Sequence, residues 1–426
     1  MGDRYGRRMQ ARVYYGEYTL RHWINMILSK NIILPKYQRS FVWDEKDVVR
    51  LLKSIQEGQF VQPVTIALYK TDEGMPGQNL IIDGQQRLSS ILLAYLGYMP
   101  DKNKFEKPEM LANDEDDAAD EPTDEAREKG PIKWRFSDLF DKDGDNRVEA
   151  IRKRLEKDPR YTSLDVNVTE QFFDKAFLGY SYIVPAIADP HIIQRGFSQL
   201  FRDINFFGKK LSALESRRSL YYLNAGLLPY LEGQIEDEKD VLCGIKLMDK
   251  MQPIKIDFVR YLSIISQYTI TENQNKVLVG YSASSSRESF YADYVSYLLG
   301  LEQEDRENKF DGFGFEETFP DNCWQERYKL LKKAIERLRP MFKMAEKNKD
   351  AFASWIDADY WFFGLIYSIV FAGKTLNEDL TGLDKVINDE IAEKKKWDYY
   401  AKSPNRLGNL RDRLGRSIDI IWEYVH

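Results

Sequence analysis

The chain has 426 residues, of which 43% are hydrophobic and 31% are charged, and its formal net charge is -6. This length predicts two or three domains, and this composition is typical of a folded globular protein. The negative charge argues against a uniformly basic nucleic-acid coat, although a local basic groove remains open.

The cysteines and the apolar segments predict a cytoplasmic protein without a membrane anchor. Cys243 and Cys323 lie too far apart for a paired zinc or disulfide motif. The polar, arginine-rich N-terminus lacks the apolar region of a secretory signal. The most apolar stretch, Tyr360 to Ala372, is shorter than the roughly 20 residues needed to span a bilayer, so we expect a buried core helix.

Residues 13–100 alternate short β-type runs with helical patterns, which predicts a small α/β domain. Its best specified helix begins after Asp44, which can cap it, buries a stripe that includes Val48 and Leu51, and ends at Gly58. The expected elements are Ile32 to Tyr37, Asp44 to Gly58, Val61 to Tyr69 and Leu80 to Gly97.

Residues 101–130 are crowded with aspartate and glutamate and contain almost no apolar residues. A solvated, flexible insertion is favoured over a nucleic-acid mimic or an autoinhibitory flap. Residues 131–250 and 251–426 are mainly helical, so the fold class is α+β, with an α/β head and a helical body. The clearest helical segments are His191 to Asn205, Ala213 to Ala225, Ser286 to Leu301, Asn322 to Lys347, Ala353 to Ala372 and Asn405 to Val425.

The strongest local motif is Asp83-Gly84-Gln85-Gln86-Arg87, which follows an apolar strand and opens a helix. The free amides and the dipole of a helix N-terminus favour an anion. Gly84 removes the side chain where a ligand could approach, and Arg87 can donate two hydrogen bonds to phosphate oxygens. Asp83 could hold Mg²⁺, orient a water or cap the helix, and the local pattern favours capping. The two glutamines suit reading a base edge or placing a water.

Two other clusters admit both a binding and a structural interpretation. Gln38 and Arg39 lie beside aromatic residues and could contact a base and phosphate, or Arg39 could form an ordinary ion pair while Tyr37 and Trp43 pack in the core. A second group gathers donors at the turn of a helical hairpin, where a solvated turn is favoured. Its polar residues are Arg202, Asn205, Lys209 and Lys210.

Together these stretches resemble the GmrSD-type restriction-endonuclease N-terminal domain family, a branch of the ParB and sulfiredoxin-like superfamily. The resemblance covers roughly residues 15–230, so residues 131–250 would complete the family domain and 251–426 would form a C-terminal helical domain. The matching residues are Pro35, Gln38, Arg39 and Trp43, then Asp83 to Arg87, then Asn205, Gly208, Leu211 and Glu215.

The resemblance implies a nucleotide-dependent component of a prokaryotic system that restricts modified or foreign DNA. It implies that Asp83, Gln86 and Arg87 act in NTP hydrolysis and that Asp83 binds Mg²⁺. It also implies a set of residues that contact the nucleotide or its phosphates. These are Gln38, Arg39, Gly84, Gln85, Arg87, Asn205 and Lys209.

Many relatives carry or partner an HNH-type nuclease, whose metal site needs histidines. Only His22, His191 and His426 are present, and none lies in such a motif. The expected partners are therefore an NTP, DNA and a separate nuclease or effector subunit, and self-association stays open. The alternatives are a ParB-like module that reads DNA modification without turnover, and a nuclease in its own right.

Residues 250–426 contain no identifiable catalytic motif. Tyr360 to Phe363 is predicted to be core or a partner-docking face. A cluster of arginines near the C-terminus could meet phosphate, but neighbouring acidic residues favour a solvated face. These arginines are Arg406, Arg411, Arg413 and Arg416.

Overall fold

The chain forms two compact units in the computed structural model. The first unit comprises Met1–Pro108 and Glu121–Leu223, and the second comprises Glu109–Asp120 and Asn224–His426. The structure describes residues 11–34, 41–69, 78–106, 111–112, 131–141, 144–186, 196, 200, 213–221, 224, 226–235, 245–249, 252–277, 284–301, 309–346 and 348–426.

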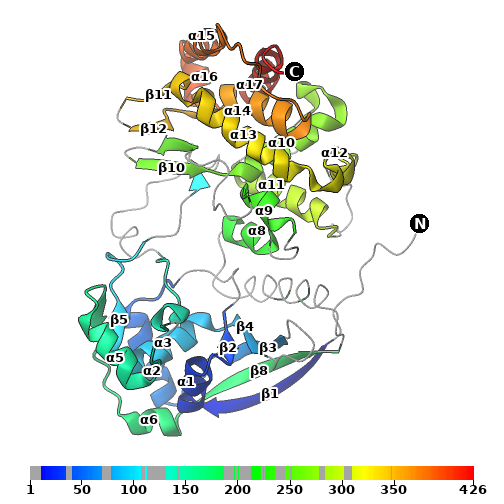
Figure 1. The fold of residues 1–426 in the computed structure, drawn as a ribbon. Helices are drawn as coiled ribbons and strands as arrows, with labels where there is room; N and C mark the ends of the chain where they lie inside the picture. Colours follow the sequence, from blue (N-terminus) through cyan, green and yellow to red (C-terminus); the bar gives the residue numbers. More distant parts are fainter. Residues whose placement is uncertain are drawn as a thin grey trace. The chain divides into compact units, whose positions relative to one another are not determined.

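A five-stranded mixed sheet organises the first unit, in the order β1-β8-β3-β4-β2. β1 pairs with β8 along its whole length in antiparallel fashion, and the two form a long ribbon at one side of the sheet (Figure 1). β3 runs parallel to β8 and antiparallel to β4, and β2 runs parallel to β4. The strands are β1 (Ala11–Thr19), β2 (Ile32–Ile33), β3 (Val64–Tyr69), β4 (Gln78–Asp83) and β8 (Phe177–Pro185).

Helices pack on this sheet and bury its inner face. The core joins Trp23 of α1, Leu52 of α2 and Leu92 of α3 to Val64 and Ile66 of β3. A two-stranded sheet of β5 and β7 lies in the same unit. The remaining elements are α1 (Leu20–Leu28), α2 (Glu45–Gln56), α3 (Gln85–Leu96), β5 (Tyr98–Pro100), η2 (Phe136–Leu139), α5 (Val148–Lys157), β7 (Tyr161–Ser163), α6 (Glu170–Lys175) and α8 (Ala213–Tyr221).

Local sequence signals predicted α2 and the β4 to α3 turn correctly. Asp44 accepts a hydrogen bond from the Asp47 amide at 3.0 Å, and the Asp47 carboxylate accepts from the Asp44 amide at 3.2 Å, so the helix begins with a capping box. Gly58 follows its end with a φ of 66°. α1 and β8 were not predicted, and α1 precedes the helix expected over Asp44 to Gly58.

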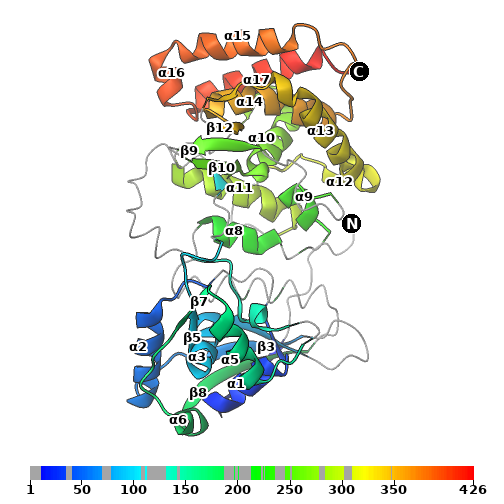
Figure 2. The same cartoon turned by 60° about the vertical axis from the view of Figure 1, so that its left-hand side comes forward.

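The second unit combines a five-stranded sheet, β11-β12-β9-β10-β6, with a helical body. Figure 2 shows α14, α15 and α17 lying together beyond the sheet of this unit. The strands are β6 (Leu111–Ala112), β9 (Lys246–Asp249), β10 (Gln252–Ile256), β11 (Met344–Ala345) and β12 (Asn348–Phe352). The helices are α9 (Leu228–Glu232), α10 (Phe258–Thr271), η3 (Gln274–Lys276), α11 (Ser284–Leu298), α12 (Phe315–Thr318), η4 (Pro320–Asn322), α13 (Trp324–Leu338), η5 (Arg339–Met341), α14 (Trp355–Leu365), η6 (Ile366–Phe371), α15 (Leu383–Lys395), α16 (Asp398–Lys402) and α17 (Leu407–Trp422).

The acidic insertion contributes a strand to this second sheet. Leu111 and Ala112 of β6 pair in parallel with Lys255 and Ile256 of β10. Nearer its start, Lys102 donates to the Val42 carbonyl at 2.7 Å. The expectation of a flexible insertion over 101–130 is therefore corrected at 101–106 and 111–112. The apolar residues Leu111 and Ala112 precede the acidic run and can pair with the edge of a strand. The other residues of the insertion lie outside the described part.

The apolar stretch from Tyr360 to Ala372 is core, as predicted. Most of its side chains are buried in α14 and the π-helical turn η6 that continues it. At the end of η6, Arg327 donates hydrogen bonds to the carbonyl oxygens of Val370 and Phe371 at 2.8 and 2.9 Å. Among the described residues, no helix is both long and apolar enough to cross a membrane.

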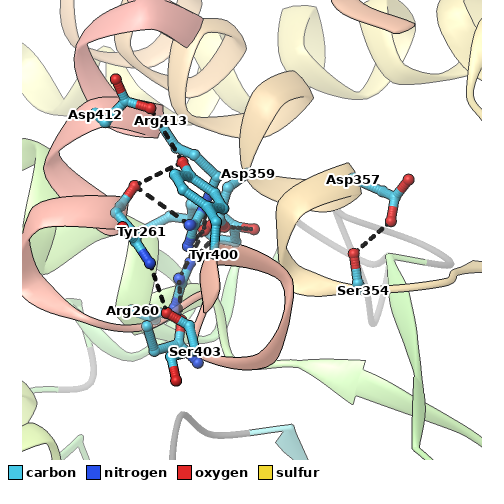
Figure 3. Close-up of polar contacts among 11 residues, drawn as sticks. Arg260, Tyr261, Ser354, Asp357, Asp359, Tyr400, Ser403, Asp412 and Arg413 are labelled. Atoms are coloured by element: carbon cyan, nitrogen blue, oxygen red, sulfur yellow. Dashed lines mark hydrogen bonds and ion pairs between the residues drawn. The ribbon is translucent and has the colours of Figure 1, made fainter. Parts of the chain in front are cut away.

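A buried ion cluster ties α10, α14 and α17 together. Asp359 accepts hydrogen bonds from Arg260 at 2.7 and 2.9 Å, from Arg413 at 2.9 and 3.1 Å, and from the Tyr261 hydroxyl at 2.9 Å (Figure 3). The three charged side chains are fully buried. Arg413 therefore lies neither on the solvated face expected for the C-terminal arginines nor where phosphate could reach it.

Candidate functional site

The turn between β4 and α3 strongly favours a glycine at its centre. Gly84 caps α3 with φ 97° and ψ 11°, in the left-handed region that other residues rarely adopt. A Cβ atom there would lie 2.9 Å from Cγ2 of Val64 and 3.2 Å from Nη2 of Arg87. The side chains of Val64 and Arg87 thus fill the space beside the Gly84 Cα atom, so a larger residue fits only if they move. The expectation that a ligand could approach through this space is therefore wrong.

Asp83 and Arg87 form an ion pair across the first turn of α3. The Arg87 Nη2 atom donates to Asp83 Oδ2 at 2.5 Å, and the two side chains are 12% and 26% exposed, respectively. The interpretation of Asp83 as the helix cap is therefore wrong, because Gly84 occupies the cap position and no side chain caps the helix. Asp83 instead lies directly before the cap residue, and its carboxylate pairs with Arg87, which neutralises its charge.

The loop before β3 fixes the other side of the Arg87 guanidinium. Nη1 of Arg87 donates to Oε1 of Gln62 at 3.3 Å, and Nη2 lies 3.5 Å from the Pro63 carbonyl oxygen. The Nε atom is buried and has no hydrogen-bond partner within the described ranges. No sequence motif indicated Gln62 or Pro63, and only the pairing of Thr65 with Asp83 in the sheet brings this loop to the turn.

Gln86 connects the turn to the segment that enters α2. Its side-chain oxygen accepts hydrogen bonds from the amides of Val42 and Trp43 at 3.0 and 3.4 Å, and the residue is only 7% exposed. These hydrogen bonds give Gln86 a structural role, because they link the first turn of α3 to the backbone that precedes α2. Trp43 packs against the core beside it, in agreement with the structural interpretation of that residue.

Gln85, the first residue of α3, has a buried amide without a partner. The residue is 4% exposed, and neither Nε2 nor Oε1 makes a hydrogen bond to any residue that the structure describes. Leaving such a group unpaired costs about 1–3 kcal/mol. An amide of this kind at the N-terminus of a twelve-residue helix points to a polar ligand that would satisfy it.

The other predicted binding residues cannot be placed beside this turn. Gln38, Arg39, Asn205 and Lys209 lie outside the residues that the structure describes. The neighbouring Phe41 is fully buried and forms a β-bridge with Ile132. The site that the structure brings together therefore consists of Asp83 to Arg87 with Gln62, Pro63 and Val64.

The turn offers Mg²⁺ one carboxylate. No group of three histidine, cysteine, aspartate or glutamate residues within the described ranges could hold a metal ion. Magnesium commonly binds through one or two carboxylates together with substrate phosphates and waters. Asp83 fits that mode only in part, because Arg87 already pairs with its carboxylate.

One protein family matches the part of the chain that contains this turn. The model of the GmrSD restriction endonuclease, N-terminal domain, matches residues 20–222. The match spans every element from α1 to α8 and so includes Asp83 to Arg87. Comparisons with curated proteins and with solved structures found no match.

Proposed function

Residues 20–222 belong to the GmrSD restriction endonuclease N-terminal domain family, and from this we propose that the chain is the nucleotide-binding regulatory component of a restriction system. In this proposal the turn from Asp83 to Arg87 binds the phosphates of a nucleoside triphosphate and supports its hydrolysis. The observation that carries it is the buried, unpartnered amide of Gln85 at the N-terminus of α3.

The geometry of the turn suits a phosphate group. Gly84 permits the left-handed turn that opens α3, and the helix dipole adds a partial positive charge at the first amides of that helix. Arg87 holds its guanidinium one turn from the first amide of α3, and its Nε atom makes no hydrogen bond to the part of the chain that the structure describes. An arginine so placed can donate paired hydrogen bonds to phosphate oxygens.

Nucleotide binding would exchange partners within the Asp83 and Arg87 pair. Phosphate oxygens would compete with Asp83 for the guanidinium, and Mg²⁺ would compete with Arg87 for the carboxylate. When bound with the nucleotide, Mg²⁺ would supply neutralisation of the phosphate charge. Asp83 would hold that ion, while Arg87 and the amides of α3 would position the phosphates.

We assign DNA cleavage to a separate subunit in this proposal. The chain contains three histidines, and none lies in an HNH-like motif. Modified or foreign DNA would trigger the system, and nucleotide binding or hydrolysis at the turn would regulate cleavage in response. Nothing in the chemistry of the turn selects a particular DNA modification.

Replacing Arg87 with alanine should weaken nucleoside triphosphate binding about 10- to 150-fold, since a hydrogen bond to a charged group contributes about 1.5–3 kcal/mol. Titration calorimetry with each of the four triphosphates and Mg²⁺ would measure this, and phosphate release with and without modified DNA would report turnover. Arg160→Ala is a matched control, because Arg160 forms an exposed pair with Asp158 in the same unit.

Two results would count against the proposal. Wild-type protein that neither binds nor hydrolyses any triphosphate, with or without DNA, would exclude the nucleotide role. Equal affinities for the wild type and Arg87→Ala would exclude this turn as the phosphate site. Salt-sensitive DNA binding without any nucleotide effect would favour the module that reads DNA modification.

A further inference from the structure

An exposed phenylalanine lies close along the chain to the Arg87 contacts. Phe60 is 88% exposed, the highest value for a large hydrophobic side chain among the residues described. Single exposed apolar residues are common on protein surfaces. Phe60 is distinguished by its place in the loop that contacts Arg87.

The loop is fixed on the side that follows α2. Gly58 has a φ of 66°, and the Gln59 amide donates to the Ser54 carbonyl at 2.8 Å. The Ser54 hydroxyl also donates to Oε1 of Gln59 at 3.1 Å. The backbone immediately before Phe60 is therefore anchored to the end of a helix.

The loop is fixed on its other side as well. Val61 packs against the hydrophobic core, and Gln62 and Pro63 accept the hydrogen bonds of Arg87. Phe60 is thus held between two anchored segments with its ring in solvent. Because the backbone on both sides is anchored, binding of a flat ligand would order only the side-chain torsions of Phe60.

The spacing places Phe60 near a nucleotide bound at the turn. Two residues of extended chain span at most about 7 Å, so the Cα atom of Phe60 lies within about that distance of the Cα atom of Gln62. Gln62 in turn contacts the guanidinium proposed to bind phosphate. The base of a nucleotide is separated from its phosphates by the ribose, so a side chain at this distance from Arg87 can reach the base.

We propose that Phe60 stacks on the base of the nucleotide whose phosphates bind at Asp83 to Arg87. This inference rests on the proposed function and adds the residue that contacts the base. Stacking uses the π face that every base presents, so this contact tolerates all four bases. Stacking on Phe60 by itself therefore gives no strong preference among the four bases.

A ligand without a base separates this role from a structural one. Phe60→Ala should weaken binding of ATP with Mg²⁺ about 5- to 150-fold and leave binding of inorganic tripolyphosphate within about twofold of wild type. Phe60→Trp should retain ATP binding, because tryptophan also offers an aromatic face. Trp397→Ala is the control, since Trp397 is a 66% exposed aromatic residue of the other unit.

The possible failures are distinguishable. Unchanged ATP binding by Phe60→Ala would overturn the stacking role while leaving the phosphate site intact, and so would an equal loss of ATP and tripolyphosphate binding. If only a DNA or protein interaction were lost, Phe60 would instead belong to a docking surface. Wild-type protein that binds neither ATP nor tripolyphosphate would overturn the proposed function and this inference together.

Discussion

Replacing Asp359 with alanine should destabilise the second unit by about 3–5 kcal/mol, the usual effect of removing one partner from a buried ion pair. The substitution would leave Arg260 and Arg413 fully buried without their shared carboxylate. Arg260 also lies 4.2 Å from the ring centre of Trp355, and this contact cannot replace a counterion. Urea denaturation of the full chain would measure the loss.

Asp350 provides the matched control for this experiment. It pairs with Arg339 at 3.0 Å, but the two side chains are 67% and 36% exposed, respectively. Its replacement with alanine should change stability by only about 0–1 kcal/mol. Hydrogen exchange in α10, α14 and α17 would localise the effect of Asp359→Ala to the helices that the cluster joins. Equal effects of the two substitutions would show that the cluster does not stabilise the unit.

The same cluster should give the second unit a characteristic acid response. Burial alone would raise the pKa of Asp359, but the charges and hydrogen bonds of Arg260 and Arg413 outweigh it and lower that pKa. A lowered pKa in the folded state stabilises the fold above the unfolded value of about 3.9, and this contribution disappears as the pH falls through the folded value. The stability difference between the wild type and Asp359→Asn should therefore be constant near neutral pH and shrink below about pH 4. A difference that began to shrink at pH 6 would contradict this assignment.

Replacing Gly84 with alanine should cost about 2–5 kcal/mol and abolish nucleotide binding. The left-handed backbone accounts for about 1–2 kcal/mol. The 2.9 Å approach of the new Cβ atom to Val64 adds about 1–3 kcal/mol of overpacking. Any relaxation that relieves the contact would move the first amides of α3 away from the position that a phosphate requires.

The other end of α3 offers a control with the same backbone requirement. Gly97 has a φ of 80°, and a Cβ atom there would meet nothing within 4 Å. Gly97→Ala should therefore show the cost of the backbone alone and keep nucleotide binding. In a Val64→Ala background, the added cost of Gly84→Ala should fall, which a double-mutant cycle would reveal. Similar losses for the two glycine substitutions would show that contact with Val64 is unimportant.

Local patterns predicted the parts of the fold that local forces specify. Asp44, the apolar stripe and Gly58 defined α2, and the apolar run before Gly84 defined β4 and α3. β8 escaped prediction because its tyrosines and Gly179 blur its alternation, and its place between β1 and β3 depends on partners far away in sequence. The burial of Arg413 was equally hidden, since only the folded helices bring Asp359 to it.

At the candidate site, too, the local sequence predicted some features while others depend on residues distant in the chain. The motif predicted the glycine turn and the position of Arg87, while the resemblance supplied the family that the comparison then showed. The role of Asp83 could not be chosen from the motif, because capping and pairing with Arg87 use the same carboxylate. The loop with Phe60 and Gln62 reaches the turn only through the pairing of β3 with β4.

The short strand β6 affects how this protein can be divided. The chain passes between the two units three times, after residues 108, 120 and 223, because Glu109–Asp120 belongs to the second unit. A fragment that began at Asn224 would lack Leu111 and Ala112 and would present their side of β10 as an open strand edge, a known route to aggregation. A soluble version of the second unit should therefore carry residues 109–120 grafted beside β10. Leu111 and Ala112 also lie within the family match. Changes to the insertion at these residues are therefore constrained by pairing with β10 of the second unit.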